Sequence, residues 1–452
     1  RLLSVGINLV TQVLIARYLS TAAFGAFAYA LSVVALVGGF VGLGFERAIP
    51  RFLPLYDEHG DRPRFLGTLV LVVGVILGVG GSIALLMIGF QGQLLGWFAP
   101  DPFTVTIVSI MILLAPIEAL DTVMTDLFAS FRSSRAIFFR KYVLGPVLRL
   151  LVVGILIATA SGLEVLAIGY VITGLIGIAL YATLLPRLLQ RVRSVGDAGA
   201  PGSRRLIVPL RDIISYTVPL LTMDLVLQSM SSLNAILVGN MHGMDDVAAL
   251  RVVDSTARLN SIVFSTFSIL FVPAAARFFA RNDRVSMRDL YWRRAAWIAV
   301  LSFPIFVVTF SLAEPLTVLL FGERYRSSAA ILAVLSLARF FDAALGANGQ
   351  TIRVFGGIKE IVVINVVVAV MNLVFALLLI PPFAANGAAL TILLSYVVYN
   401  VLKQVALHRV TEIPRFEMAY LPVYGAIVLV AITLGVVVTV VQPPLVVSLG
   451  LA

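Results

Sequence analysis

The sequence predicts an all-α membrane protein that crosses the bilayer about fourteen times. Of its 452 residues, 60% are apolar and only 12% are charged, and the mean hydropathy is +1.04, whereas an average soluble domain carries roughly 25% charged residues. The apolar residues gather into runs of about 20, the length of a helix that crosses a hydrocarbon core of about 30 Å. The low charge, the high hydropathy and the length of the apolar runs together indicate a chain that lies within a lipid bilayer.

Apolar runs bounded by charge, glycine or proline mark the individual spans. The expected spans are 2–16, 23–45, 65–89, 103–129, 143–161, 165–186, 213–239, 247–271, 295–321, 328–352, 361–380, 386–402 and 418–441, followed by a stub at 443–452. We expect the stub to be the first part of a fourteenth helix, cut short at Ala452.

Basic residues concentrate in the loops that follow even-numbered spans. Most of the 33 Lys and Arg residues lie there, Arg140, Arg294 and Lys403 being counted among them. The few in the other loops are Arg17, Arg324 and Arg326. Because short basic loops stay in the cytoplasm, the pattern predicts a multi-pass protein of the cell membrane with a cytoplasmic N-terminus. The net charge of +10 then reflects loops facing anionic lipid headgroups, and no nucleic-acid partner is expected.

The two halves of the chain repeat each other. Pro50 matches Pro273, and Asp121 matches Asp342, at a nearly constant shift of about 220 residues. Since a repeat of six helices preserves orientation, the halves should be parallel lobes related by an axis along the membrane normal. The predicted parts are a six-helix lobe at 1–186, a basic cytoplasmic linker at 187–212, a second six-helix lobe at 213–402, and two appended helices within 403–452.

Few residues are suited to catalysis or metal binding. The chain has no cysteine, and His59, His242 and His408 are far apart in the sequence, so we expect no metal site and no cofactor. The longest outer loop, 90–102, carries Asp101 as its one acid, which cannot supply a pair for general acid and base catalysis. We therefore expect that the protein is not an enzyme. A polytopic glycosyltransferase or ligase is kept as the second of two alternative functions.

A polar stripe is expected in the eighth span. Its members recur at steps of three and four residues, which places them on one face of a regular helix over roughly 25 Å. They are Arg251, Asp254, Arg258, Ser261, Ser265 and Ser268. A charge at the bilayer centre costs about 2.5 to 3.5 kcal/mol even on lenient scales, so the stripe indicates a cavity wall that binds substrate, or alternatively an internal ion-pair cluster. The equivalent face of span 2, with Gly38 and Gly42, offers close packing or open space but no charge.

Other spans hold further polar candidates. Asn8 and Gln12 in span 1, and Asp224 and Gln228 in span 7, are expected to line a cavity. Arg339 lies three residues from Asp342 and could either pair with it or bind substrate. Arg149 is a lone cation in span 5, which could either pair with the acidic residues of span 4 or bind substrate. Candidates for a coupling ion are Asp224, Glu118, Asp121 and Asp126.

Local motifs give the chain a family resemblance. The segments QVLIARYLS, AAFGAFAYALS, GGFVGLG and ERAIPRFLP, in this order from residue 12 onward, resemble the polysaccharide flippases of the multidrug/oligosaccharidyl-lipid/polysaccharide exporter superfamily. The resemblance implies alternating access by two lobes and transport of a lipid-diphosphate-linked oligosaccharide from the cytoplasmic to the outer leaflet. It also implies the bilayer as a partner, and a polysaccharide polymerase or glycosyltransferases as pathway partners. A cation-coupled multidrug or small-molecule antiporter of the same superfamily is the first alternative.

Charge separates these two transport alternatives. Arg251 and Arg258 would repel an organic cation unless Asp254 and Asp224 dominate the local field. A diphosphate instead suits paired arginines, because the guanidinium group donates two parallel hydrogen bonds to phosphate oxygens. The sequence therefore favours an anionic substrate.

Overall fold

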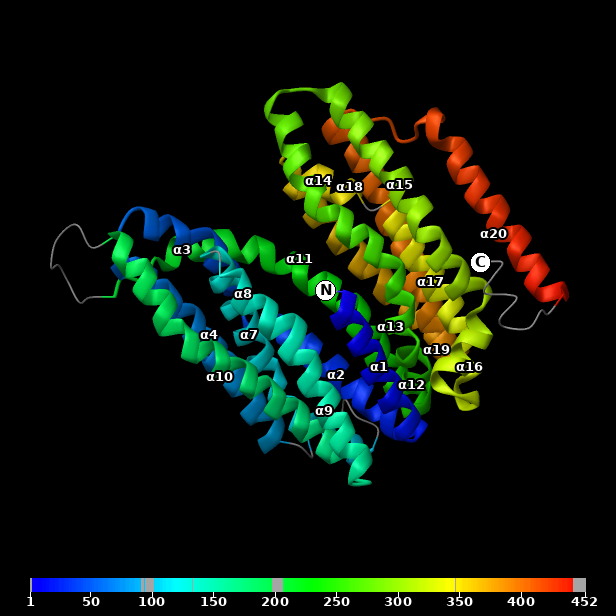
Figure 1. Ribbon diagram of the computed structural model, residues 1–452, viewed down its shortest axis with the longest axis horizontal. Coiled ribbons are helices and arrows are strands. Elements are labelled where there is room, and N and C mark those ends of the chain that lie inside the picture. The colour runs from blue at the N-terminus through cyan, green and yellow to red at the C-terminus, as the bar shows by residue number, and fades with distance from the viewer. Residues whose placement is uncertain are drawn as a thin grey trace. The chain divides into compact units, whose positions relative to one another are not determined.

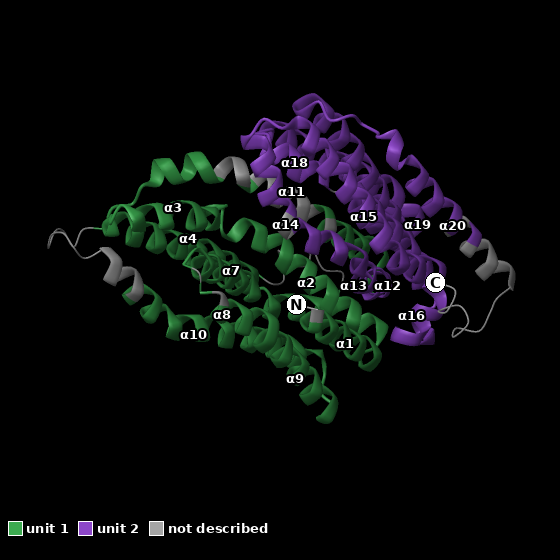
Figure 2. Cartoon of the chain, turned by 45° about the horizontal axis from the view of Figure 1, so that its top comes forward, with its two compact units in different colours: residues 1–244 green, residues 245–452 purple. Residues whose placement is uncertain are grey.

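The computed structural model describes residues 2–90, 93, 101–131, 133–196, 206–345 and 347–441. In these ranges every regular element is a helix, which confirms the all-α fold class. The chain divides into two compact units, 1–244 and 245–452, coloured separately in Figure 2. The stub at 443–452 lies outside the described residues.

Unit 1 is a bundle of helices (Figure 1). Its elements are α1 (Leu2–Tyr18), α2 (Thr21–Val41), η1 (Phe45–Arg47), α3 (Ala48–Glu58), α4 (Arg62–Gly89), α6 (Pro102–Met111), α7 (Leu114–Ser130), α8 (Ser134–Ile137), the π-helix η3 (Phe138–Leu144), α9 (Gly145–Ala158), α10 (Leu163–Gly196) and α11 (Leu210–His242).

Unit 2 is a second helical bundle, whose first helix begins at the unit boundary. Its elements are α12 (Met244–Val252), α13 (Asp254–Ala257), η4 (Arg258–Ser261), α14 (Ile262–Ala280), α15 (Arg284–Ser311), α16 (Ala313–Phe321), η5 (Glu323–Tyr325), α17 (Ser328–Leu345), α18 (Ala347–Val354), α19 (Ile358–Thr411), η6 (Met418–Tyr420) and α20 (Leu421–Val441). The long α19 is two helices joined at a kink, because Ala384 has φ 48° and ψ −127°. This kink separates the predicted spans 361–380 and 386–402.

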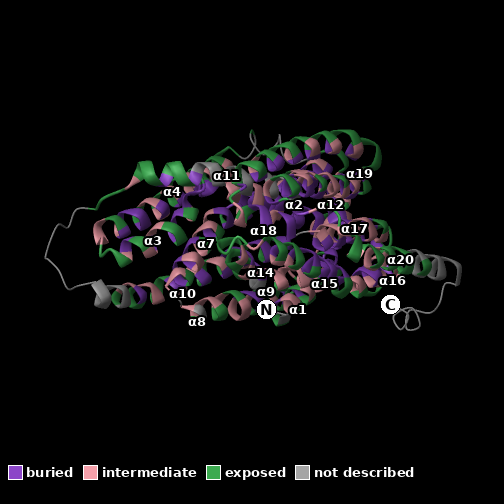
Figure 3. Cartoon of the chain, turned by 90° about the horizontal axis from the view of Figure 1, so that it is seen from above, coloured by how far each residue is buried: buried purple, intermediate pink, exposed green. Residues whose placement is uncertain are grey.

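The helices have outward faces that fit a bilayer. Eight described helices are long and apolar enough to cross a membrane, and a ninth is added when the bent pair Met244–Ser268 and Phe271–Ala280 counts as one span. Large apolar side chains project outward, for example Leu85 of α4, 72% exposed, and Leu378 of α19, 66% exposed. The buried and exposed faces of these helices can be followed in Figure 3. The chain is thus a multi-pass membrane protein, and the total of fourteen helices stays a prediction.

Several helices begin where the sequence supplies a capping side chain. Asp61 accepts from the backbone N–H of Arg64 at 3.2 Å at the start of α4. Asp101 caps α6 in the same way, accepting from the backbone N–H of Thr104 at 2.8 Å. Asp283 caps α15 through the backbone N–H of Ser286 at 3.0 Å. Asp101 therefore has a structural role at a helix start.

The unit boundary differs from the predicted lobe boundary. α11 packs against α2 in unit 1, and the Tyr29 hydroxyl of α2 donates to the Asn240 side-chain oxygen of α11 at 3.0 Å. The two units are defined by which helices pack together, whereas the predicted lobes are defined by the sequence repeat. The division into 1–186, 187–212, 213–402 and 403–452 therefore stays a prediction. The helix of the sixth span continues from the predicted end at residue 186 to Gly196.

The eighth span is not the single regular helix that the polar stripe assumed. α12 ends at Val252, a four-residue α-helix follows, and Arg258–Ser261 is a 3₁₀-helix before α14 begins. A 3₁₀ turn has three residues per turn instead of 3.6, so the six stripe residues do not continue along one straight face. This expectation of a straight stripe was wrong.

Three basic residues assigned to loops lie inside the helical bundles. Arg294 in α15 is 4% exposed and Lys403 in α19 is 5% exposed. The side chain of Arg140, which lies in the π-helix η3, is 11% exposed. Their assignment to loops was wrong, because a hydropathy window treats any charge as a span boundary. The cytoplasmic placement of the other basic loops stays a prediction.

Candidate functional site

A cluster of three arginines around one acid lies where span 8 is broken. Arg258 donates to Asp254 Oδ2 from Nε at 3.0 Å and from Nη2 at 2.7 Å. Arg251 Nη1 lies 3.5 Å from the same oxygen. The spacings of three and four residues thus bring these side chains together, as expected for neighbours on consecutive turns. We call Arg251, Asp254, Arg258 and Arg339 the arginine cluster.

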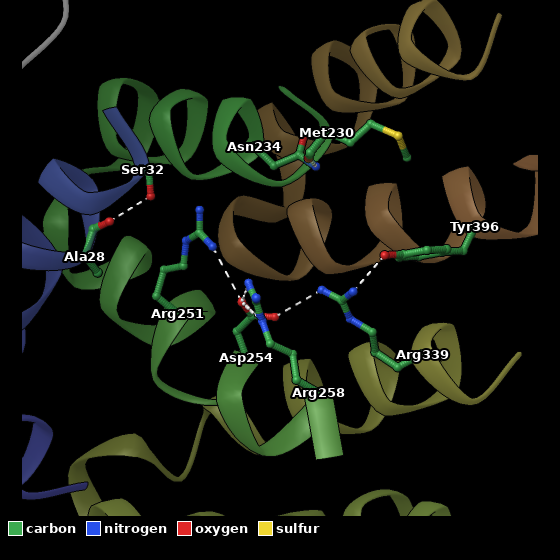
Figure 4. Close-up of polar contacts among 9 residues, drawn as sticks. All are labelled: Ala28, Ser32, Met230, Asn234, Arg251, Asp254, Arg258, Arg339 and Tyr396. Carbon is green, nitrogen blue, oxygen red and sulfur yellow. Dashed lines mark hydrogen bonds and ion pairs between the residues drawn. The ribbon is translucent and has the colours of Figure 1, made fainter. Parts of the chain in front are cut away.

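The third arginine comes from α17 and meets the other oxygen of the acid. Arg339 Nη2 lies 3.4 Å from Asp254 Oδ1, and Nη1 donates to the Tyr396 hydroxyl at 2.7 Å. The guanidinium also lies over the Tyr396 ring, 5.3 Å from its centroid. Figure 4 shows the three guanidinium groups directed at Asp254 and Arg339 reaching on to Tyr396. Three cations and one anion leave two net positive charges in this cluster.

The cluster is unevenly accessible. The side chains of Arg251, Asp254 and Arg339 are only 16%, 14% and 18% exposed, whereas that of Arg258 is 56% exposed. The side chains of Arg251, Asp254 and Arg339 are therefore held inside the bundle, whereas Arg258 presents N–H donors to an incoming anion. Such an arrangement can bind a phosphate through charge-assisted hydrogen bonds.

Arg339 does not pair with Asp342, so this alternative of the sequence analysis was wrong. Asp342 Oδ1 instead lies 3.7 Å from Lys403 Nζ and accepts from the Asn400 amide at 3.0 Å. The two α17 residues, one turn apart, face different positions of the kinked helix α19: Tyr396 for Arg339, and Asn400 with Lys403 for Asp342. Lys403 also lies over the Tyr399 ring, 3.7 Å from the centroid.

The serines of the stripe are engaged locally. Ser265 donates to the backbone oxygen of Ile262 at 2.8 Å, and Ser268 donates to that of Phe264 at 2.7 Å. The Ser268 hydroxyl also accepts from Arg294 Nη2 at 2.9 Å. Arg294 further packs over the Phe271 ring, 4.2 Å from its centroid. Ser261 ends the 3₁₀-helix and is half-buried, and a binding role for these serines stays a prediction.

Unit 1 holds a second charged group between α7, η3 and α9. Asp121 Oδ1 lies 2.9 Å from Arg140 Nη2, and Glu118 Oε1 lies 3.9 Å from Arg149 Nη2. The expected partnership of Arg149 with the acids of span 4 is therefore present. Arg140 occupies space left by Gly177 of α10, since a Cβ at that position would overlap its guanidinium group. We call Glu118, Asp121, Arg140 and Arg149 the paired group.

Two cavities meet at the paired group. One of about 360 Å³ is lined by α2 and α7, with Gly38, Gly42, Glu46, Glu118 and Thr122 among its residues. The other, of about 220 Å³, shares Glu118 and Thr122 and adds the rest of the paired group, with Tyr170 and Thr173. The wall at Gly38 is open, because a Cβ there would meet nothing within 4 Å. Of the two alternatives for the span 2 face, open space is the correct one at Gly38.

The remaining predicted residues lie apart from these groups or outside the description. Asn8 of α1 is exposed and Gln12 is half-buried. The side chains of Asp224 and Gln228 in α11 lie outside the described residues. Asp126 of α7 is half-buried, and no ion pair to it within 4 Å is found in the described part of the chain. Where the structure describes the chain, no three His, Asp or Glu side chains gather closely enough to hold a metal ion.

The sequence analysis did not single out several of these contact residues. Tyr396 and Tyr170 look like ordinary apolar span residues, and Arg140 and Lys403 look like loop charges. A usable signal for Tyr396 is its spacing from Asn400 and Lys403, since steps of four and three put all three on one helical face.

Comparisons with known proteins agree on the architecture. An inward-facing multidrug resistance MATE family transporter of the MOP superfamily is 15% identical, with a TM-score of 0.72 over 91% of this chain and 95% of that chain. The lipid II flippase MurJ in an inward closed conformation is 14% identical, with a TM-score of 0.71 over 98% of this chain and 91% of that chain. At these identities the likeness shows the fold.

Sequence comparison adds the family. The capsular polysaccharide biosynthesis protein CapF of Staphylococcus aureus is 24% identical over 190 residues, which is 42% of this chain and about half, 48%, of that protein. The polysaccharide biosynthesis protein family matches residues 14–330. The fold of the chain is thus the one found in the two transport proteins above. With most of its length matched, the chain belongs to the polysaccharide biosynthesis protein family.

Proposed function

We propose that this chain flips a polyprenyl-diphosphate-linked oligosaccharide from the cytoplasmic to the outer leaflet by alternating access. The observation that carries the proposal is the arginine cluster: three guanidinium groups and one carboxylate within membrane-spanning helices, with two net positive charges. Charges inside a membrane protein are costly and mark substrate paths. The family, and the lipid II flippase among proteins of this fold, support a lipid-linked glycan as substrate.

The charge of the cluster matches that of the proposed headgroup. A diphosphate diester carries two negative charges, which balance the two net positive charges of the cluster. Arg258 presents the exposed guanidinium, and Arg339 is held in place by the Tyr396 hydroxyl. A guanidinium fixed by a neighbour loses less rotamer entropy when it binds phosphate than a free one does.

Asp254 serves as an internal stand-in for the substrate phosphate. Its two oxygens accept from the same arginines that a diphosphate would engage. When substrate arrives, Arg258 exchanges the carboxylate for a phosphate oxygen, and when substrate leaves, the carboxylate takes the guanidinium back. This exchange keeps Arg258 paired with an anion in both states.

The orientation of transport follows from the basic loops. We place the N-terminus and the loops after even-numbered spans in the cytoplasm of a multi-pass cell-membrane protein. For coupling to a proton or sodium ion, Asp126 and Asp224 are the candidates that we retain. Glu118 and Asp121 are each paired with an arginine.

The decisive test is a flipping assay with the purified chain in liposomes. The substrates are a fluorescent polyprenyl-diphosphate sugar and a lipophilic cationic drug, and the variants are wild type and Arg258→Ala. The proposal expects wild type to flip the diphosphate lipid and Arg258→Ala to flip it at least about tenfold more slowly. Transport of the drug without the lipid would instead support a multidrug antiporter and refute the flippase proposal.

A further inference from the structure

The two cavities of unit 1 combine features that suit one class of ligand. Their volumes of about 360 and 220 Å³ together reach the range of small-molecule sites, roughly 300 to 1,000 Å³. The charges that line the smaller cavity are balanced, since Asp121 pairs with Arg140 and Glu118 pairs with Arg149. A balanced wall gives no strong preference for an anion or a cation.

The paired group nevertheless offers many hydrogen bonds. A carboxylate has about four acceptor positions and a guanidinium has five N–H donors, and each ion pair uses only part of them. The side chains of Glu118 and Arg149 are 50% and 44% exposed, and Thr122, an exposed residue, adds a hydroxyl group. Because these groups belong to membrane-spanning helices, they cannot face hydrocarbon at acceptable cost. They must face water or a polar ligand.

An aromatic ring completes the wall. Tyr170 lines the smaller cavity, and the Arg149 guanidinium lies over its ring, 5.3 Å from the ring centroid. Tyr170 is itself only 9% exposed, so its ring holds Arg149 in place. Within the smaller cavity, donors and acceptors in comparable supply and the absence of a net charge suit a sugar ring, since each sugar hydroxyl both donates and accepts. An anionic headgroup would instead need an excess of cations, as the arginine cluster has.

We propose that the two cavities of unit 1 form a binding site for neutral sugar residues of the transported glycan. The inference rests on the proposed flippase function and adds a glycan-recognising site to it. Glu118, Asp121, Arg140 and Arg149 hydrogen-bond the sugar hydroxyls, with Thr122 beside them and Tyr170 holding Arg149 in place. The larger cavity beside Gly38 accommodates the remainder of the sugar unit.

Two variants test the site without disturbing the paired group. Gly38→Leu fills the larger cavity, and the open space around a Cβ at this position means that no backbone needs to move. Its control is Gly78→Leu in α4, where a Cβ likewise meets nothing within 4 Å and which lines neither cavity. Thr122→Val removes one hydroxyl. Its control is Thr106→Val, because both threonines are exposed and donate to the backbone oxygen four residues earlier, at 2.9 and 3.1 Å.

The measurement is equilibrium binding to the full chain in nanodiscs. The probes are a polyprenyl diphosphate that bears a short neutral glycan and the same lipid diphosphate without sugar. Wild type should prefer the glycan-bearing lipid, Gly38→Leu should reduce this preference about tenfold, and Thr122→Val should reduce it about threefold, as expected for losing one or more hydrogen bonds. Both controls should keep the wild-type preference, and Arg258→Ala should weaken both lipids equally.

Distinct results separate failure of the site from failure of the proposed function. Equal affinities of wild type for the two lipids, or equal weakening of both lipids by Gly38→Leu, would overturn the glycan site and leave the flippase proposal intact. If wild type bound neither lipid, the flippase proposal would fail, and binding of the free oligosaccharide would then decide the site. Its loss in Gly38→Leu, but not in Gly78→Leu, would support the site, and no binding at all would overturn it.

Discussion

Replacing Arg258 by alanine should separate binding from folding. Arg258 shares Asp254 with Arg251 and Arg339, so the acid keeps two cationic neighbours, at 3.5 and 3.4 Å, when Arg258 is removed. The side chain of Arg258 is 56% exposed, and ion pairs of this kind contribute at most about 1 kcal/mol to stability. We therefore expect Arg258→Ala to unfold at nearly the wild-type temperature.

Binding should respond much more strongly than stability. A hydrogen bond to a charged group contributes about 1.5 to 3 kcal/mol, which corresponds to a tenfold to hundredfold weaker affinity for the diphosphate lipid. Arg258→Lys should recover only part of this loss, because an ammonium group does not reproduce the two-pronged donor geometry. The opposite change, Asp254→Asn, should cost about 3 to 5 kcal/mol of stability, since it leaves three clustered cations without their acid.

The assay pairs diphosphate-lipid binding in nanodiscs with thermal unfolding of the same samples. Arg326→Ala is a matched control, because Arg326 has a side chain of 55% exposure and donates to Glu323 at 2.6 Å outside the arginine cluster. Wild-type affinity in Arg258→Ala, or an equal loss in Arg326→Ala, would refute the binding role. A large drop in unfolding temperature for Arg258→Ala would show instead that the cluster serves folding.

Three further outcomes can be checked with single substitutions. Tyr396→Phe removes the hydroxyl that accepts from Arg339 and should weaken diphosphate binding about twofold to tenfold; unchanged affinity would mean that Arg339 needs no anchor. In this cysteine-free chain, Ser133→Cys and Ser286→Cys should react with an impermeant thiol reagent only from the cytoplasm, and Ser327→Cys only from outside; the reverse pattern would invert the proposed orientation. Hydrogen bonds from Ser286 lower the pKa of the Asp283 carboxyl at the start of α15, so the cap stabilises the fold above the ordinary pKa of aspartate and this contribution disappears as the pH falls through the lowered value. Asp283→Ala should therefore unfold at a lower temperature than wild type at neutral pH, with a difference that shrinks in acid; a difference independent of pH would show that the carboxylate charge is not involved.

The presence of the helices could be predicted from the sequence, because helix formation depends on residues that are close together in the chain. The hydropathy of each run and the capping residues Asp61, Asp101 and Asp283 are properties of neighbouring residues, and the structure has helices starting directly after all three. The contacts of Arg251 and Arg258 with Asp254 were equally predictable, because they depend on a spacing of one turn. Family membership followed from short motifs that the family match covers in part.

Contacts between distant segments could not be predicted in the same way. Arg339 has Asp342 one turn away but meets Asp254, 85 residues earlier in the chain. Lys403 has the composition of a loop residue, yet Asp342 and the Tyr399 ring accommodate it inside the bundle. A hydropathy window counts every charged residue as unfavourable, because it does not include the partner residue that offsets the charge. The 3₁₀ segment at Arg258–Ser261 is likewise invisible to a count that assumes 3.6 residues per turn.

Gly177 shows how a residue without a side chain can determine the electrostatics of a membrane bundle. Any larger residue at this position would displace the Arg140 guanidinium from its place beside Asp121. Asp121 would then lose the arginine that lies 2.9 Å away within a membrane-spanning helix, a cost that its own sequence neighbourhood does not reveal. We therefore expect variation at position 177 to be coupled to variation at positions 121 and 140. A homologue that carries alanine here should also lack the arginine, the acid, or both.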